Sequence, residues 1–244
     1  MAPPKRMTAD RWRTSTELNA LWSHVEKRLS TRQWQLLAAA CLRHVEGELW
    51  NEEFLAGVDV LERRADSLVG DDDWQTALTD CETAYEEADV ESDYKDNECL
   101  IEAVFRAVSG DYWEALDKAA EAHAWTVIPI YMIDDNNQRV HHQAELKERA
   151  AQCDLLRDIV PFKPVRIDSA LLEWRDRTVV KLAQAAYEQR ERTTQHNLDL
   201  KHLAILADAL EEAGCTNEDV LAHLRGPGPH VRGCWSVDLL LGKE

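Results

Sequence analysis

Apolar side chains recur three and four residues apart along most of this 244-residue sequence. In the segments Leu18–Leu29 and Leu198–Ala213 this spacing places them on one face of an α-helix, which has about 3.6 residues per turn. The same pattern predicts helices at 73–89, 95–108 and 139–159. Only nine Gly and seven Pro interrupt such stretches, whereas a protein of many short strands needs frequent turn residues. We therefore predict an all-α, multi-helix fold.

The sequence VPFKPVRI at 160–167 separates the predicted helices into two groups. Its two prolines lack an amide N–H and favour an extended conformation in the residues before them, so a helix does not continue through it. We predict a flexible N-terminus at 1–13, a helical lobe at 14–159 and a second helical lobe at 168–244, packed together and joined by this extended connector. For the apolar, β-branched run at 125–133, which contains Pro129, we expect a buried extended linker or a broken helix.

Composition excludes several classes of protein. The 46 acidic and 28 basic residues give a formal net charge of −18, which argues against a nucleic-acid binder that neutralises phosphates with Lys and Arg. There is no run of about 18 apolar residues to span a membrane, and the first residues lack the apolar core of a secretory signal. The six cysteines are scattered with no C-x-x-C pair, as in a protein whose thiols stay reduced. We expect an acidic, cytoplasmic protein.

The stretch from Asp71 to Glu98 contains twelve acidic residues and one basic residue, Lys95. A calcium loop beginning at Asp89 does not fit, because its sixth position would be Tyr94 in place of Gly and its twelfth Leu100 in place of Glu. Such a stretch is typical of a solvated helical surface. Two other interpretations remain open, namely that it docks a basic protein partner or that it imitates a nucleic acid. The candidate interaction residues are Glu86, Glu87, Asp89 and Glu91.

Two cysteines and two histidines occur within twenty residues near the C-terminus, and thiolates and imidazoles are good zinc ligands. A helix over 216–225 would place Cys215 and His223 roughly 12 Å apart along its axis, which is too far for one ion. His230 and Cys234 could bind from one face of a final helix at 230–241, with His223 as a third ligand. The alternative is a buried cysteine, a capping histidine and ordinary polar contacts.

Arg225 and Arg232 flank the sequence GPGP at 226–229 and form a small basic group in an acidic protein. They could bind an anion through their guanidinium groups, or pair with acids of the preceding helix such as Glu211 or Glu212. Because the Gly-Pro sequence cannot continue a helix, we expect Arg225 to close one helix. We expect Trp235 to be the main apolar anchor of the next helix.

Catalytic sequence motifs are absent: there is no GxxxxGK[ST] phosphate loop, no GxSxG nucleophile elbow and no HExxH zinc helix. We therefore expect a protein-interaction or scaffolding module without catalytic activity. Its protein partner is unknown, and a basic protein is one candidate. Two alternatives are kept. One is a metal-dependent enzyme or zinc-stabilised protein that uses His223, His230 and Cys234, and the other is a nucleic-acid mimic or inhibitor that uses the acidic 71–98 face.

The string LADALEEAGCTNEDVLAHLRGPGPHVRGCWSVDLLLGKE, residues Leu206–Glu244, resembles the end of a paralogous family of uncharacterised planctomycete-type bacterial proteins. The string AAQCDLLRDIVPFKPVRID at Ala150–Asp168 and the TVVKLAQAAY helix that follows are similar to the same family in order and spacing. The relatives often have Cys where this chain has Leu224, and two adjacent cysteines in the helix where it has only Cys41. The resemblance covers the chain from about residue 146 and implies a bacterial protein, but no reaction.

Overall fold

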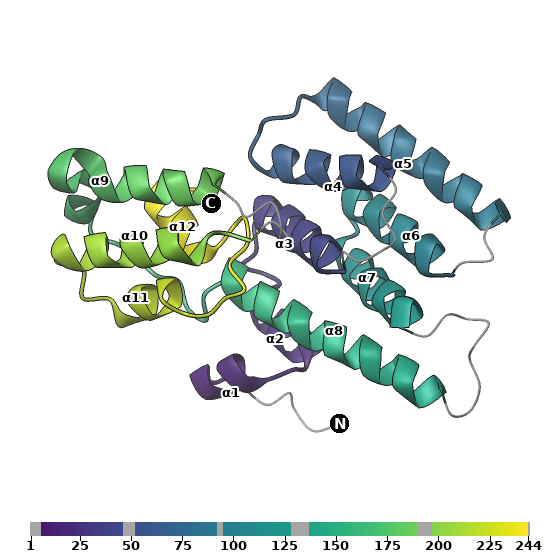
Figure 1. The fold of residues 1–244 in the computed structure, drawn as a ribbon, viewed down its shortest axis with the longest axis horizontal. Helices are drawn as coiled ribbons and strands as arrows, with labels where there is room; N and C mark the ends of the chain where they lie inside the picture. The colour runs from purple at the N-terminus through teal and green to yellow at the C-terminus, as the bar shows by residue number, and fades with distance from the viewer. Residues whose placement is uncertain (1–5, 46–51, 92–94, 128–136, 190–196, 244) are drawn as a thin grey trace. The chain divides into compact units, whose positions relative to one another are not determined.

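A computed structural model describes residues 6–45, 52–91, 95–127, 137–189 and 197–243, without the side chains of 52–54, 87–91 and 95–98. These ranges contain twelve helices and no strand, which confirms the predicted all-α fold (Figure 1). No described helix has the length and apolar character to cross a bilayer. The helices are α1 (Ala9–Thr14), α2 (Leu18–Val25), α3 (Thr31–His44), α4 (Glu52–Ala65), α5 (Asp71–Glu91), α6 (Lys95–Ser109), α7 (Tyr112–Val127), α8 (Gln138–Ile159), α9 (Ser169–Glu188), α10 (Leu200–Glu212), α11 (Glu218–Leu224) and α12 (Trp235–Leu241).

The chain forms two compact units, an N-terminal unit (Met1–Cys153) and a C-terminal unit (Asp154–Glu244). The dividing point lies inside α8, whereas the sequence analysis placed it at the proline-containing segment 160–167. That segment is indeed neither helix nor strand, and Asp168 caps the N-terminus of α9. The last residues of α8 belong to the C-terminal unit because Asp158 bonds to residues 223, 230 and 231.

In the N-terminal unit, α3 packs against α4, α6 and α7, and α6 packs against α5 and α7. Helix α3 begins where Ser30 accepts a hydrogen bond from the Gln33 amide while the Gln33 side chain accepts one from the Ser30 amide. Every residue from Gln35 to Arg43 is buried, because neighbouring helices cover more than one face of α3. The buried guanidinium of Arg43 is neutralised by Glu62, whose carboxylate accepts its Nε–H at 2.9 Å.

The sequence analysis placed residues 9–13 in a flexible N-terminus. These residues form most of α1, which Thr8 caps by accepting a hydrogen bond from the Arg11 amide. Trp12 is buried and its ring lies 5.6 Å from that of His24, so a single aromatic side chain anchors the segment. Residues 1–5 lie outside the described part. Of the run at 125–133, residues 125–127 end α7, and the remainder is also outside the described residues.

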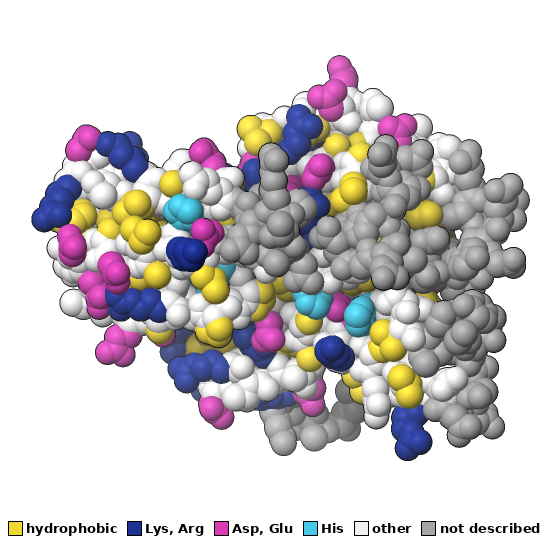
Figure 2. All heavy atoms as spheres, in the orientation of Figure 1, with side chains coloured by type: hydrophobic (Ala, Val, Ile, Leu, Met, Phe, Trp, Pro, Cys, Tyr) yellow, Lys and Arg dark blue, Asp and Glu magenta, His cyan; other side chains and the backbone are white. Residues whose placement is uncertain are grey.

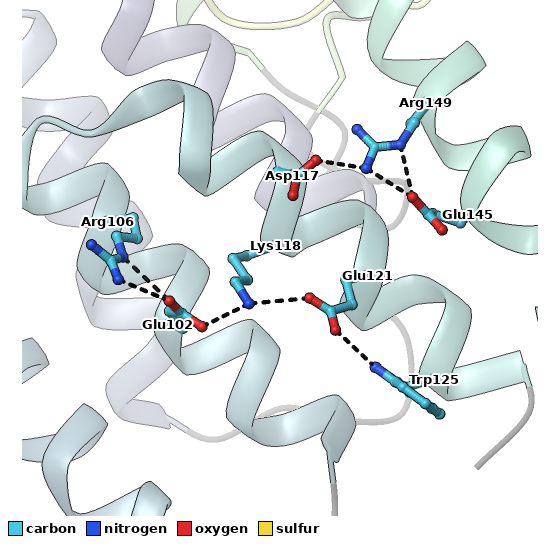
Figure 3. Close-up of polar contacts among 8 residues, drawn as sticks. All are labelled: Glu102, Arg106, Asp117, Lys118, Glu121, Trp125, Glu145 and Arg149. Atoms are coloured by element: carbon cyan, nitrogen blue, oxygen red, sulfur yellow. Dashed lines mark hydrogen bonds and ion pairs between the residues drawn. The ribbon is translucent and has the colours of Figure 1, made fainter. Parts of the chain in front are cut away.

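Alternating charges connect α6, α7 and α8 (Figure 3). On α7, the Lys118 ammonium lies between Glu102 of α6 at 3.1 Å and Glu121 at 3.2 Å. On α8, Arg149 pairs with Asp117 of α7 at 2.6 Å and with Glu145 at 2.8 Å. These side chains are half-buried, so solvent screens their attraction less than it would at an open surface.

Replacing Lys118 by Met should lower the free energy of unfolding by about 1–3 kcal/mol, because Glu102 and Glu121 then lose a hydrogen-bonded cation. The matched control is Lys181→Met, which removes a lysine paired with Asp176 in an exposed position. That change should cost less than about 0.5 kcal/mol. Urea unfolding of both variants measures the difference. Equal losses of unfolding free energy would show that the half-buried ion pairs of Lys118 stabilise the protein no more than the exposed pair of Lys181.

In the C-terminal unit, α9 packs against α10 and α12, and α11 packs against α10 and α12. Helix α9 is interrupted near its start. Trp174 is extended, and the next three residues, 175–177, have φ between 43° and 61°, a left-handed conformation that is costly for residues with a side chain. The Arg175 guanidinium lies 4.3 Å above the Trp174 ring and pairs with Glu212 of α10, and both contacts stabilise this break.

Candidate metal centre

Four side chains from separate parts of the C-terminal unit meet at one place: Asp158, His223, His230 and Cys234. Asp158 lies in the last turn of α8 and His223 in the last turn of α11. The final helix begins at Trp235 and not at residue 230, so His230 and Cys234 do not share a helical face as the sequence spacing suggested. His230 lies in the loop after α11, and Cys234 is the residue that precedes α12.

The ligand atoms of these residues lie within a few ångströms of one another. Oδ1 of Asp158 lies 3.0 Å from Nε2 of His223 and 3.0 Å from Nδ1 of His230. Sγ of Cys234 lies 3.3 Å and 3.8 Å from the same two nitrogens, and all four atoms are within 4.8 Å of one another. Ligands at ordinary zinc bond lengths are separated by about 3.3–3.6 Å in a tetrahedral site. The residues present therefore fit a zinc ion.

Hydrogen bonds to neighbouring groups orient three of these four side chains. Oδ2 of Asp158 accepts the Val231 amide at 2.8 Å, which leaves Oδ1 directed at the cluster. Nε2 of His230 lies 3.2 Å from the Gly226 carbonyl oxygen, and Sγ of Cys234 lies 3.3 Å from the Ser236 hydroxyl. A histidine that binds a metal through one ring nitrogen commonly donates the other N–H to a carbonyl oxygen. His230 has this arrangement.

The loop at 226–234 is held in place by backbone contacts. The His230 carbonyl accepts the Leu198 amide at 2.7 Å, and the Cys234 amide donates to the Val231 carbonyl at 3.0 Å. Gly228 has a φ of +90°, and a Cβ there would lie 3.0 Å from the His230 amide nitrogen. A side chain at this position would therefore both strain the backbone and push against His230.

The charges of the cluster depend on each other. Burial favours the neutral form of Asp158, but hydrogen bonds from His223 and His230 outweigh it and hold the pKa of that carboxyl below its ordinary value. Burial likewise favours neutral His230, yet the Asp158 carboxylate raises the pKa of its imidazole above the ordinary value. Burial and then the charge of Asp158 raise the pKa of the Cys234 thiol well above the usual range. Without metal, these interactions therefore favour the carboxylate form of Asp158, the protonated imidazole of His230 and the neutral thiol of Cys234.

These shifts predict how the metal-free protein responds to pH. A raised pKa of His230 adds stability that is complete below the unfolded-state pKa of about 6.5 and is lost as pH rises through the folded-state value. The lowered pKa of Asp158 adds stability above about pH 3.9 that is lost in stronger acid. In chelator-treated samples, the stability difference between the parent and His230→Gln should therefore shrink from pH 6 to pH 8. Urea unfolding measures it, and a difference that grows over this range would contradict the ion pair.

The other predicted site residues lie elsewhere. Cys215 is buried in the apolar core of the C-terminal unit, apart from the cluster. Arg225 follows α11 as its C-cap, as expected, and pairs with Asp208 and Glu211. Arg232 lies over the Tyr187 ring at 5.2 Å and donates to its hydroxyl. Glu86 is exposed on α5, while the side chains of Glu87, Asp89 and Glu91 are outside the described residues.

Asp158 is the member of the cluster that the sequence analysis missed. Its signal was an isolated acid in the apolar sequence LLRDIV, at a position that a helix turns toward its core. A carboxylate there needs a partner, because an unpaired charge is rarely buried. The sequence does not show which partner, since His223 and His230 are 65 and 72 residues away.

Two other features of the described residues are weaker candidates. A cavity of about 320 Å³ lies between α9 and α10 at the break near Trp174. The charged residues that line it, Arg175, Glu212 and Asp208, are already in ion pairs. On the face drawn in Figure 2, acidic, basic and apolar side chains are interspersed over these helices. In the N-terminal unit, His44 and the buried Glu148 form a pair at 2.9 Å, and Cys41 and His123 interact electrostatically with the same carboxylate. Among the described residues, however, the group of potential metal ligands whose atoms converge is the one at Asp158.

Comparison with known proteins adds no assignment: no family model, no curated protein and no solved structure matches this chain.

Proposed function

We propose that this chain is a zinc-stabilised protein, in which one ion bound by Asp158, His223, His230 and Cys234 fastens the end of α8 to the C-terminal segment. The observation that supports this proposal is the convergence of four ligand atoms of suitable type within 4.8 Å. Asp158, His230 and Cys234 are almost completely buried, and His223 is 20% exposed. A closed, buried set of ligands is typical of structural zinc sites.

The ligand set favours zinc over other common ions. Calcium and magnesium prefer six or more oxygen ligands, and this site offers one carboxylate oxygen beside two nitrogens and a sulfur. Thiolate and imidazole together suit zinc in tetrahedral geometry. Four protein ligands fill the tetrahedron and leave no position for the water that a catalytic zinc usually keeps. The arrangement thus supports a structural ion better than the metal-dependent enzyme considered above.

Metal analysis of protein made without a histidine tag tests the proposal. We expect one zinc per chain after dialysis against metal-free buffer, and less than a tenth as much in Asp158→Asn and Cys234→Ser. The matched control is Cys215→Ser, which changes a buried cysteine outside the cluster and should retain the ion. Cobalt substituted for zinc should give a thiolate charge-transfer band in the parent and in Cys215→Ser, and neither Asp158→Asn nor Cys234→Ser should show it. A parent protein that binds neither zinc nor cobalt would refute the proposal.

A second candidate function is an interaction surface on α5 for a basic protein partner. Every acidic side chain of α5 that the structure describes is exposed, and these are Asp71, Asp72, Asp73, Asp80, Glu82 and Glu86. Of the ion pairs identified, Arg64 with Asp71 is the one that involves this row. A row of like charges attracts a basic partner at long range, and salt weakens that attraction. The exposure of these acidic side chains is also compatible with the nucleic-acid mimic. The binding experiment described next distinguishes the two interpretations.

Neutralising Glu86→Gln, Glu87→Gln, Asp89→Asn and Glu91→Gln together should change the free energy of unfolding by less than about 0.5 kcal/mol if the predicted solvated face is correct, because like charges on such a face mainly repel each other. The same variant should capture less of any basic protein that the immobilised parent retains at low salt and releases at high salt. Displacement of such a protein by DNA would favour the mimic. A loss of several kcal/mol would show that these acids are buried or paired.

A further inference from the structure

The four ligands of the proposed zinc site differ in how far solvent reaches them. The side chains of Asp158 and His230 are 1% and 2% exposed, and Cys234 is fully buried. His223 is 20% exposed and stands at the end of a short surface helix, α11. The imidazole of His223 therefore forms the solvent side of the cluster. This is the side from which an exchanging ligand would approach an ion held by the other three residues.

The ligands also differ in the number of hydrogen bonds that they make outside the cluster, and His223 again stands apart from the other three. Asp158, His230 and Cys234 each have a further polar contact, with Val231, Gly226 and Ser236. Within the described residues, the polar contacts of His223 involve only Nε2, the nitrogen that faces the cluster. Its ring is otherwise held by packing against His230 and Trp235, with centroids 5.0 Å and 4.8 Å away. Outer hydrogen bonds fix a ligand's orientation and commonly change metal affinity 10–100-fold, so His223 is the least restrained ligand.

We infer that His223 is the exchangeable ligand of the site, and that zinc passes to and from an external thiolate or imidazole there while the protein stays folded. This inference rests on the proposed zinc site. In the exchange, the bond from zinc to Nε2 of His223 breaks and a bond from zinc to the incoming sulfur or nitrogen forms. An incoming thiol transfers its proton to the released imidazole, and no group is oxidised or reduced. The chain would then act as a zinc-exchanging protein as well as a zinc-stabilised one.

Zinc transfer to the coloured chelator 4-(2-pyridylazo)resorcinol tests the route. With the zinc-loaded full chain, the rate should rise in proportion to chelator concentration, because the chelator attacks the folded site. His223→Ala should accelerate the transfer at least tenfold and still bind one zinc, whereas His230→Ala should fail to retain it. A rate that is independent of chelator concentration and equal to the rate of unfolding would overturn the inference.

Rescue by small ligands provides the second measurement. The cobalt form of His223→Ala should regain a four-coordinate visible spectrum on addition of imidazole, and a stronger charge-transfer band on addition of 2-mercaptoethanol. The buried position of His230 is closed to both, so His230→Ala should not respond. Equal responses of the two variants would overturn the exchange route while leaving the zinc site intact. A parent chain that binds no metal would instead refute the zinc site itself, so the two failures are distinguishable.

Discussion

Zinc at a free concentration of 1,000 times its Kd should raise the free energy of unfolding of the C-terminal unit by about 4 kcal/mol. The gain arises because the folded chain brings together ligands that are far apart in the unfolded chain, so the ion binds mainly the folded state. Urea unfolding in zinc-buffered and chelator-treated solutions measures it. Because zinc displaces protons from the thiol and from His230, this increment should grow as pH rises.

Two cysteine variants make this prediction specific. Cys234→Ala should lose the zinc-dependent increment, and Cys215→Ala should retain it, although both remove a buried thiol of the same unit. In chelator-treated solution the two variants should differ much less from each other. A zinc-dependent increment that survives in Cys234→Ala would place the ion at another site.

Replacing Trp235 by Ala should lower the free energy of unfolding by about 3–5 kcal/mol, the usual cost of removing a buried aromatic side chain. Trp235 is 8% exposed and begins α12, where it belongs to the core that α9, α10 and α11 share. Its ring also packs against His223. The loss should therefore appear with and without zinc, which separates packing from metal binding. Urea unfolding at a fixed pH is the measurement.

Trp174→Ala is the matched control for this change. Trp174 is half-buried at the break in α9 and packs against the same core without being one of its buried members. We expect it to cost less than half as much as Trp235→Ala, because less apolar surface returns to water. If Trp174→Ala were the more costly change, α12 would not be the main anchor of the C-terminal unit.

The sequence alone determined the fold class and most helix boundaries. The helix expected at 139–159 is α8 at 138–159, and that expected at 95–108 is α6 at 95–109. Ser30 and Gln33, three residues apart, cap the start of α3, and Arg225 closes α11 before the Gly-Pro loop as expected. These features depend on contacts within a few residues, namely apolar spacing, side-chain caps and the missing amide of proline, and such information is local in the sequence.

Only the tertiary structure decided the features that depend on distant partners. Trp12 packs against His24 and anchors a segment that the sequence analysis predicted to be flexible. Asp158 contacts His223 and His230, which follow it by 65 and 72 residues in the sequence. It is the fourth member of a ligand set for which the sequence indicated only three residues. Neither the start of α12 at Trp235 nor the break after Trp174 follows from apolar spacing. The physical reason is that a buried charge is stabilised by whichever groups the folded chain brings within a few ångströms, and periodicity specifies which face is buried but not what it meets.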